Sequence, residues 1–301
     1  MSFDAGGGEW GVGSSRPRDT AASRAGSPSS PTSHPAPLTA ARRRFRTEYA
    51  SHRAAEGRGE LDARTLPYVT SGPLARQWAV RARSWEAFCR RILRPAQQRA
   101  DVRAAGPLRV LDLGAGNGWL AHRAAVAGAE ALALDVRDDR VDGLGAVPSG
   151  SPVERVAASF EAIPVRDDAF DVVVFNAALH YAENLSRALG EARRVVRSGG
   201  RVAIVDSPFY ASSADGDAMV AEKRRDAHQR FGARAPALLA LPFVEYLTRE
   251  RLDEASRGTG LGDWCRHRVL YPVWYELRGL RAWLRRERAP SRFDVWESVA
   301  A

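Results

Sequence analysis

The sequence predicts an α/β fold, in which a doubly wound and mostly parallel sheet is preceded by a helical cap. Short apolar runs alternate with helical patterns through the middle of the chain, as in parallel strands joined by right-handed crossovers. A glycine-rich turn follows the first of these runs, and a carboxylate ends the second. The expected parallel strands lie near residues 108–113, 130–135, 153–157, 170–176 and 200–206.

Composition allows a sizeable core and gives no sign of a membrane span. The chain has 301 residues, of which 45% are hydrophobic, and no apolar run approaches the roughly 18 residues that a spanning helix requires. The N-terminus shows no hydrophobic signal core, so we expect a cytoplasmic protein. The two cysteines, Cys89 and Cys265, lack metal-ligand spacing, so we expect no metal site.

The charge balance is strongly basic, with a formal net charge of +9. Such a balance is typical of nucleic-acid binding. However, Lys223 is the only lysine among the 45 basic residues. Arginine in this excess, beside abundant alanine, indicates a GC-rich coding sequence as much as a phosphate-binding surface. We therefore do not expect a nucleic-acid substrate, and the sequence predicts no particular oligomeric state.

Three regions are expected along the chain. Residues 1–39 are rich in Gly, Ser, Pro and Ala and are predicted to be a disordered tail. Residues 40–105 are predicted to form the cap, with helices near 41–56 and 73–92. Pro95 should kink or end the second helix. Residues 106–301 should form the main domain.

Helix signals continue through the main domain. Asn184 is a plausible N-cap, and Gly199-Gly200 is expected to end the helix that follows it. Further helical segments are expected within 212–258 and at 273–287. Patterns near 264–271 and 292–296 alternate as half-buried strands do.

The glycine turn predicts a cofactor site. Gly114, Gly116 and Gly118 let the backbone turn tightly and approach a ligand, and the next helix would point its free N–H groups at that ligand. Asp135 ends the second strand about 20 residues later, where an acid can bind ribose hydroxyls. A dinucleotide fingerprint needs a small third residue for helix packing, whereas this chain has Trp119. These features favour a different adenosine-containing cofactor.

The run Asp112-Leu-Gly-Ala-Gly-Asn-Gly118 resembles motif I of the class I S-adenosylmethionine-dependent methyltransferases. Likeness to this family extends from about Leu108 to Asp206, about a third of the chain, and is closest to the small-molecule, quinone-biosynthesis type. The resemblance implies a Rossmann-like, seven-stranded sheet closed by an antiparallel hairpin made from 264–271 and 292–296. It also implies methyl transfer from S-adenosylmethionine to a small-molecule acceptor.

The resemblance implies which residues bind that cofactor. Asp112 would orient the turn and the amino group, Asp135 would bind the ribose, and Ser159 would stand where many relatives have Asp. The full predicted cofactor set is Asp112, Gly114, Ala115, Gly116, Asn117, Asp135, Val136, Ser159, Phe160 and Asn176.

Catalytic residues are harder to predict, because methyl transfer from a sulfonium needs mainly alignment and exclusion of water. His180 follows the fourth strand and is a candidate base, with packing as the alternative. Tyr49 and His52 of the cap are candidates to cover the site. Arg76 and Trp78 could close over it, and Asp206 could contact the acceptor. Tyr181 could simply pack on the next helix, and His267 is expected in the outer hairpin.

Alternatives remain open. An RNA methyltransferase could use the arginine-rich helices as a phosphate surface, and a non-catalytic S-adenosylmethionine-binding module would share the same turn. Asn176 is followed by Ala-Ala-Leu rather than Pro-Pro-aromatic, which disfavours DNA amino-methylating enzymes. The segment 273–287 combines aromatic, leucine and arginine residues. It is predicted to pack its apolar stripe on the domain or, alternatively, to contact a membrane surface.

Overall fold

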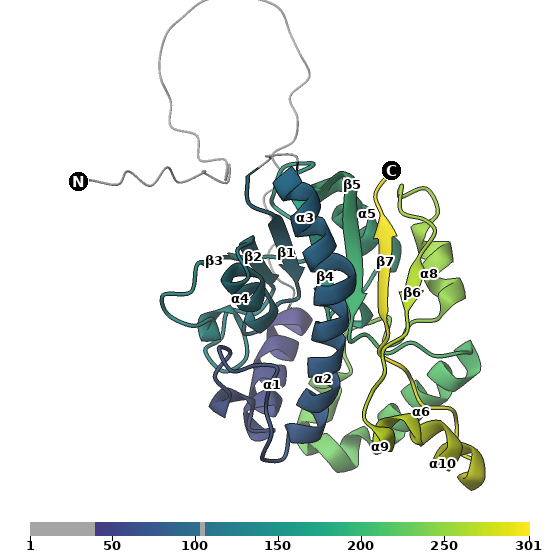
Figure 1. Ribbon diagram of the computed structural model, residues 1–301. Helices are drawn as coiled ribbons and strands as arrows, with labels where there is room; N and C mark the ends of the chain where they lie inside the picture. The colour runs from purple at the N-terminus through teal and green to yellow at the C-terminus, as the bar shows by residue number, and fades with distance from the viewer. Residues whose placement is uncertain (1–39, 103–105) are drawn as a thin grey trace, which may run out of the picture.

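The computed structural model describes residues 40–102 and 106–301, which form a seven-stranded sheet with helices on both faces (Figure 1). The strand order is β3-β2-β1-β4-β5-β7-β6. Neighbours among the first five strands pair in parallel, whereas β7 is antiparallel to both β5 and β6. The strands are β1 (Arg109–Leu113), β2 (Glu130–Asp135), β3 (Val153–Ala157), β4 (Phe170–Asn176), β5 (Val196–Val205), β6 (Cys265–His267) and β7 (Val295–Val299). The predicted fold class is confirmed, while the predicted tail, 1–39, lies outside the described residues.

Both faces of the sheet are covered because its strands are apolar on both sides. On one face, Val110 and Val172 pack against α2, α3 and α4, and α2 and α3 run as one long rod across the sheet in Figure 1. On the other face, Leu111 and Val173 pack against α5 and α8. The helices are α1 (Ala40–Ala55), α2 (Ala75–Phe88), α3 (Arg94–Val102), α4 (Trp119–Val126), α5 (Leu185–Val195), α6 (Ser213–Phe231), α7 (Ala235–Leu238), α8 (Arg249–Ser256), α9 (Val273–Glu276) and α10 (Arg278–Arg285).

The strand order fixes where a ligand can bind. From β1 the chain proceeds outward to β2 and β3, and then returns to the other side of β1 with β4. The crossovers therefore reverse direction between β1 and β4, and open α/β sheets bind ligands at the carboxyl edge beside such a switch point. The glycine turn after β1 lies at this edge.

Pro95 does not end the long cap helix, so one of the two outcomes predicted for it is wrong. A π-helical turn, Cys89–Leu93, joins α2 directly to α3, and Pro95 is the second residue of α3. The wider turn just before the proline accommodates its ring and its missing N–H at the point where a regular α-helix would clash. The rod therefore continues across the sheet.

Gly199-Gly200 does not end α5 either. The helix stops at Val195, and β5 begins at the next residue. The two glycines lie inside β5, where Gly199 has a φ of 71° and the register with β4 shifts between Phe170 and Val172. Glycine in a strand often marks such a bulge.

The predicted N-cap of α5 is confirmed. The side-chain oxygen of Asn184 accepts a hydrogen bond of 2.9 Å from the backbone N–H of Arg187. Replacing Asn184 with Ala should lower the free energy of unfolding by about 1 kcal/mol, because an N–H at the helix start loses its partner. Urea denaturation measures this, with Ser186→Ala, an exposed site in the same turn, as the matched control. Equal midpoints for both variants would contradict the capping role.

The C-terminal hairpin forms, but it is shorter than expected. Of the segment 264–271 only Cys265–His267 is a strand, and the predicted helix is divided into α9 and α10. The apolar stripe of α10 does not pack on the domain, since Leu280, Trp283 and Leu284 are exposed. In the part of the chain that the structure describes, no helix combines the length and apolarity that crossing a bilayer requires.

Candidate functional site

Three positions of the turn after β1 require glycine. Gly114, Gly116 and Gly118 all have positive φ angles, of 69°, 56° and 68°. A Cβ at Gly114 would lie 2.3 Å from the Cβ of Ala178, and one at Gly118 would lie 2.7 Å from Val147. The turn is therefore held close to the loops that follow β2 and β4, with α4 starting immediately behind it.

Asp135 ends β2 beside this turn and is 7% exposed. One carboxylate oxygen accepts the backbone N–H of Gly116 at 2.8 Å, and the other accepts the backbone N–H of Arg137 at 2.8 Å. Burial raises the pKa of Asp135, while the Arg137 guanidinium and these N–H groups lower it. A carboxylate has about four acceptor positions, so the two backbone bonds leave capacity for further donors.

Three buried side chains at the carboxyl edge hold oxygen atoms without a hydrogen-bond partner among the described residues. Asp112, in β1, uses one oxygen to accept the N–H of Ala121 in α4 at 3.2 Å, but its other oxygen has no partner. The side-chain amide oxygen of Asn176, at the end of β4, has no hydrogen-bond partner. Both carboxylate oxygens of Asp206, just after β5, also lack one. Burial raises the pKa of Asp112 to about 8, and Asp135 adds to this effect.

Unpartnered buried oxygens are costly, and they collect where a ligand supplies the missing donors. Here they lie at the ends of three neighbouring strands, next to the glycine turn. Such a set of acceptors fits a ligand that carries positive charge and N–H or O–H groups.

The backbone is strained where Asp206 leaves the sheet. Asp206 has a φ of 54°, in the left-handed region that residues other than glycine rarely adopt. Strict strand alternation would send its side chain to the face opposite Val205, but its carboxylate lies 4.0 Å from Arg81 of α2, on the same face as Val205. Strain of this kind collects at functional sites.

Asp206 is electrostatically poised. Burial raises the pKa of its carboxyl to about 6, and the Arg81 guanidinium opposes that rise. This pKa is close to physiological pH, which suits a group that accepts a proton during a reaction.

His180 lies in the short helical turn Leu179–Tyr181 after β4. Its Nδ1 is 3.5 Å from the Ser207 hydroxyl, and its ring packs on Tyr181 with centroids 4.3 Å apart. Burial lowers the pKa of His180 to about 3, and the cations Lys223 and Arg81 add to this. The ring is neutral at physiological pH, and it is a weaker base than the Asp206 carboxylate.

Helix α1 covers the carboxyl edge. Tyr49 donates to or accepts from the hydroxyl of Tyr181 at 3.0 Å, and its ring lies 5.1 Å from the Arg137 guanidinium. Arg53 bonds to Asp142 at 2.7 Å. Tyr49 therefore lies beside the loops after β2 and β4.

Other predicted residues lie at varying distances from the turn. Phe160 packs edge-on against Phe175, and its ring is 3.8 Å from the position of a Cβ on Gly114. The Ser159 hydroxyl accepts the N–H of Glu161 at 3.1 Å, so it is already engaged in its own loop. Val136 is partly exposed just beyond β2.

The remaining predicted residues are held mainly by their neighbours. Ala115 and Asn117 are buried within the turn, where Asn117 accepts from the N–H of Trp119 at 3.4 Å. His52 packs on Phe231, with ring centroids 4.9 Å apart.

Trp78 and Arg76 do not close over the site. Trp78 is 1% exposed and packs against Trp119 in the core, and Arg76 lies over the ring of Trp274. Sequence reasoning missed Arg81, which stands over the Trp78 ring at 5.0 Å and reaches Asp206. Its signal was the helical spacing of three residues from Trp78, which places both side chains on one face.

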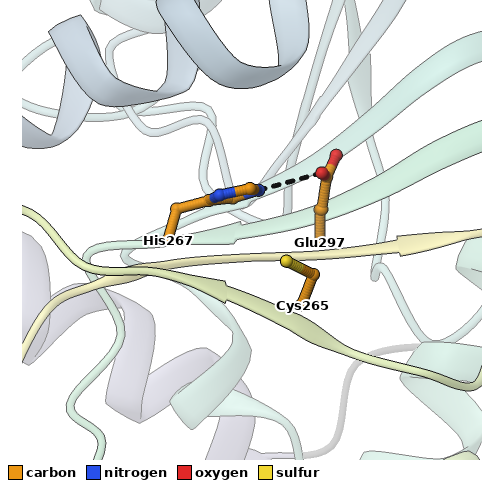
Figure 2. Close-up of side chains that lie close together, drawn as sticks. All are labelled: Cys265, His267 and Glu297. Atoms are coloured by element: carbon orange, nitrogen blue, oxygen red, sulfur yellow. Dashed lines mark hydrogen bonds and ion pairs between the residues drawn. The ribbon is translucent and has the colours of Figure 1, made fainter.

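A possible metal-ligand group lies away from the glycine turn, on the outer hairpin (Figure 2). Cys265 and His267 of β6 and Glu297 of β7 bring one ligand atom each within 4.8 Å of one another. Glu297 already bonds through Oε1 to His267 Nε2 at 2.9 Å and through Oε2 to Arg201 at 2.5 Å, so an ion held by Oε1 and Nε2 would have to break the bond between them. His267 lies in the hairpin, as expected.

Comparison with known proteins identifies the central segment. Residues 111–204 match the family model described as a methyltransferase domain. A malonyl-[acyl-carrier protein] O-methyltransferase of Methylococcus capsulatus is 37% identical over 130 residues, which are 42% of this chain and 44% of that protein. The ubiquinone/menaquinone biosynthesis C-methyltransferase UbiE of Methylobacterium nodulans is 32% identical over 125 residues, 40% of this chain and 47% of that protein. The chain thus spans less than half the length of these two relatives.

A solved structure shares the fold. It is a chain from a complex between the Trm112 methyltransferase activator of Haloferax volcanii and a methyltransferase. The superposition has a TM-score of 0.54 and covers 85% of this chain and 97% of that one, with 17% sequence identity. The family match, the strand order and the glycine turn agree with one another. Residues 111–204 are thus similar to a methyltransferase domain, and the described chain shares the fold of that solved structure.

Proposed function

We propose that this protein transfers the methyl group of S-adenosylmethionine to a small-molecule acceptor. The observation that carries the proposal is the set of unpartnered oxygens of Asp112, Asn176 and Asp206 beside the glycine turn. A sulfonium cofactor with an ammonium group and ribose hydroxyls offers the hydrogen-bond donors that these oxygens lack.

We assign the cofactor contacts to the chain's own groups. The turn of Gly114, Ala115 and Gly116 passes beneath the cofactor through its backbone, and Asp112 and Asn176 face the charged end. Asp135 accepts from the ribose hydroxyls with the capacity that its backbone bonds leave free. Val136, Phe160 and Ser159 surround the adenine, and Asn117 shapes the turn.

The cofactor supplies an electrophilic methyl group when it is bound. The chain must then align the nucleophile of the acceptor, exclude water and accept a proton where the acceptor carries one. We assign proton acceptance to the Asp206 carboxylate, because the pKa of Asp206 of about 6 makes it a stronger base than His180. Tyr49 and His180 enclose the acceptor.

The acceptor class is proposed from the cap contact and the names of two relatives. Tyr49 of α1 and Tyr181, which follows β4, are in hydrogen-bond contact at 3.0 Å, so the cap lies close to the carboxyl edge. One relative is named for O-methylation of malonyl-[acyl-carrier protein], and the other is named for C-methylation in ubiquinone and menaquinone biosynthesis. We propose a metabolite acceptor with an ionisable O–H or an acidic C–H, rather than a folded nucleic acid.

The test uses the full chain with methyl-labelled S-adenosylmethionine and a metabolite extract of the host. The proposal expects calorimetric binding of S-adenosylmethionine and of S-adenosylhomocysteine, together with a labelled product whose mass identifies the acceptor. If neither nucleoside binds at millimolar concentration, the proposal fails. Binding without any labelled product would favour a non-catalytic module, and salt-sensitive transfer to RNA would favour an RNA methyltransferase.

A further inference from the structure

Exposed apolar side chains gather on one small part of the described chain. Six of the ten large hydrophobic residues that are exposed in residues 40–102 and 106–301 lie between 270 and 284. They include Trp283, which is 73% exposed, and Leu284, which is 65% exposed. The six, which we call the α10 patch, are Leu270, Val273, Leu277, Leu280, Trp283 and Leu284. Such a concentration marks an interaction site.

Helix α10 exposes its large apolar side chains to the solvent, unlike an ordinary surface helix. Leu280 and Leu284, four residues apart, share one face, while Ala282 lies on the opposite face and is buried against the domain. An amphipathic surface helix normally packs its large apolar stripe inward. Here the small residue faces the protein and the large apolar side chains face the solvent.

The patch is bordered by arginines that have no polar partner among the described residues. Arg281, Arg285 and Arg286 are exposed, and none of them forms an ion pair or side-chain hydrogen bond with a described residue. By contrast, Arg288 at the end of the same segment bonds to Glu222 at 2.7 Å. The three unpaired cations remain available for an external anion.

The segment is held firmly in this orientation. Arg278 donates to the carbonyl of Ser291 at 2.7 Å, and the N–H of Ala289 bonds to Asp215 of α6 at 2.9 Å. Because α6 begins a few residues after the carboxyl end of β5, α10 lies at the same side of the sheet as the glycine turn, as Figure 1 shows. The exposed side chains are thus presented by a fixed scaffold.

We propose that the α10 patch docks on an anionic membrane surface. Aromatic and leucine side chains that project outward between arginines fit the boundary between lipid headgroups and acyl chains, and the cations fit acidic headgroups. A second copy of this chain fits the patch less well, since two such surfaces would oppose like charges. Docking is independent of the methyl transfer proposed above, and each can fail without the other.

The experiment is co-sedimentation of the full chain with vesicles of equal parts phosphatidylglycerol and phosphatidylcholine. The wild type should sediment with these vesicles and lose binding on pure phosphatidylcholine or in high salt. Changing Trp283→Ser together with Leu284→Ser should weaken partitioning at least about tenfold, because two large apolar side chains no longer become buried among the lipids. Arg281→Glu with Arg285→Glu should weaken binding to the acidic vesicles selectively.

Val126→Ser is the matched control, because Val126 is an exposed apolar residue of α4. It should sediment like the wild type, and all variants should melt as the wild type does. Wild-type protein that stays in the supernatant with acidic vesicles would overturn the proposal. So would equal sedimentation of the Trp283/Leu284 variant, or a dimer in gel filtration that this variant dissociates.

Discussion

Asp135→Ala is expected to weaken binding of S-adenosylmethionine by about 1.5–3 kcal/mol, or roughly 10–150-fold in Kd. The carboxylate holds the N–H groups of Gly116 and Arg137, so its loss removes the proposed ribose contact and also the bond that positions the glycine turn. Isothermal titration calorimetry with S-adenosylmethionine and S-adenosylhomocysteine measures the change.

Glu130→Ala provides the comparison, because Glu130 lies at the opposite end of the same strand, where it pairs with Arg109. This variant should keep the wild-type affinity. Circular dichroism should first establish that Asp135→Ala is folded, since two backbone donors lose their acceptor. An unchanged Kd in a folded Asp135→Ala protein would refute the ribose assignment.

Asp206→Asn is expected to make the protein more stable at neutral pH while abolishing proton acceptance. Burial raises the pKa of Asp206 to about 6 from its ordinary value of 3.8. Between these two pH values the folded protein keeps a proton on Asp206 that the unfolded chain releases, so stability falls as the pH rises through this window. Above pH 6 the free energy of unfolding of the wild type is lower by about 3 kcal/mol in total.

The asparagine variant should escape this loss. Its free energy of unfolding, measured by urea denaturation from pH 4 to pH 8, should exceed that of the wild type by about 2–3 kcal/mol at the upper end and match it at the lower end. Asp226→Asn removes an exposed carboxylate of α6 and serves as the charge-matched control. If the free energy of unfolding changed with pH in the same way for the wild type and Asp206→Asn, the raised pKa of Asp206 would be contradicted. Full methyl transfer by the variant would contradict the role of Asp206 as proton acceptor.

The sequence was sufficient to predict the sheet because its strands are encoded locally. The run from Leu108 to Leu113 is apolar apart from Arg109 and Asp112, and the glycines that follow it indicate a tight turn. Asn184 was likewise predictable, since an N-cap depends on neighbouring residues alone. The glycine turn and Asp135 were predicted from the residues themselves, the other cofactor residues came from the family resemblance, and the contacts of all of them remain proposals.

The features that were missed depend on contacts between distant segments. Pro95 is tolerated because of a π-turn that no local rule predicts, and Gly199 serves a bulge whose need arises from pairing with β4. Arg81 and Asp206 are 125 positions apart and meet only when α2 lies across β5. The outward direction of α10 is likewise set by what its opposite face contacts, which an amphipathic pattern does not specify.

The ion pairs that hold α1 over the carboxyl edge should affect how fast a ligand binds and dissociates. Asp112 and Asp135 are buried, so a ligand reaches them only after the covering groups move aside. That cover is held by the charge pairs Arg46–Asp138 at 2.6 Å and Arg53–Asp142 at 2.7 Å. Salt screens the Arg46–Asp138 pair, whose aspartate side chain is 71% exposed, more than the Arg53–Asp142 pair, whose side chains are 16% and 8% exposed. Raising the ionic strength should therefore loosen the Arg46 contact while the Arg53 contact still holds α1 in place.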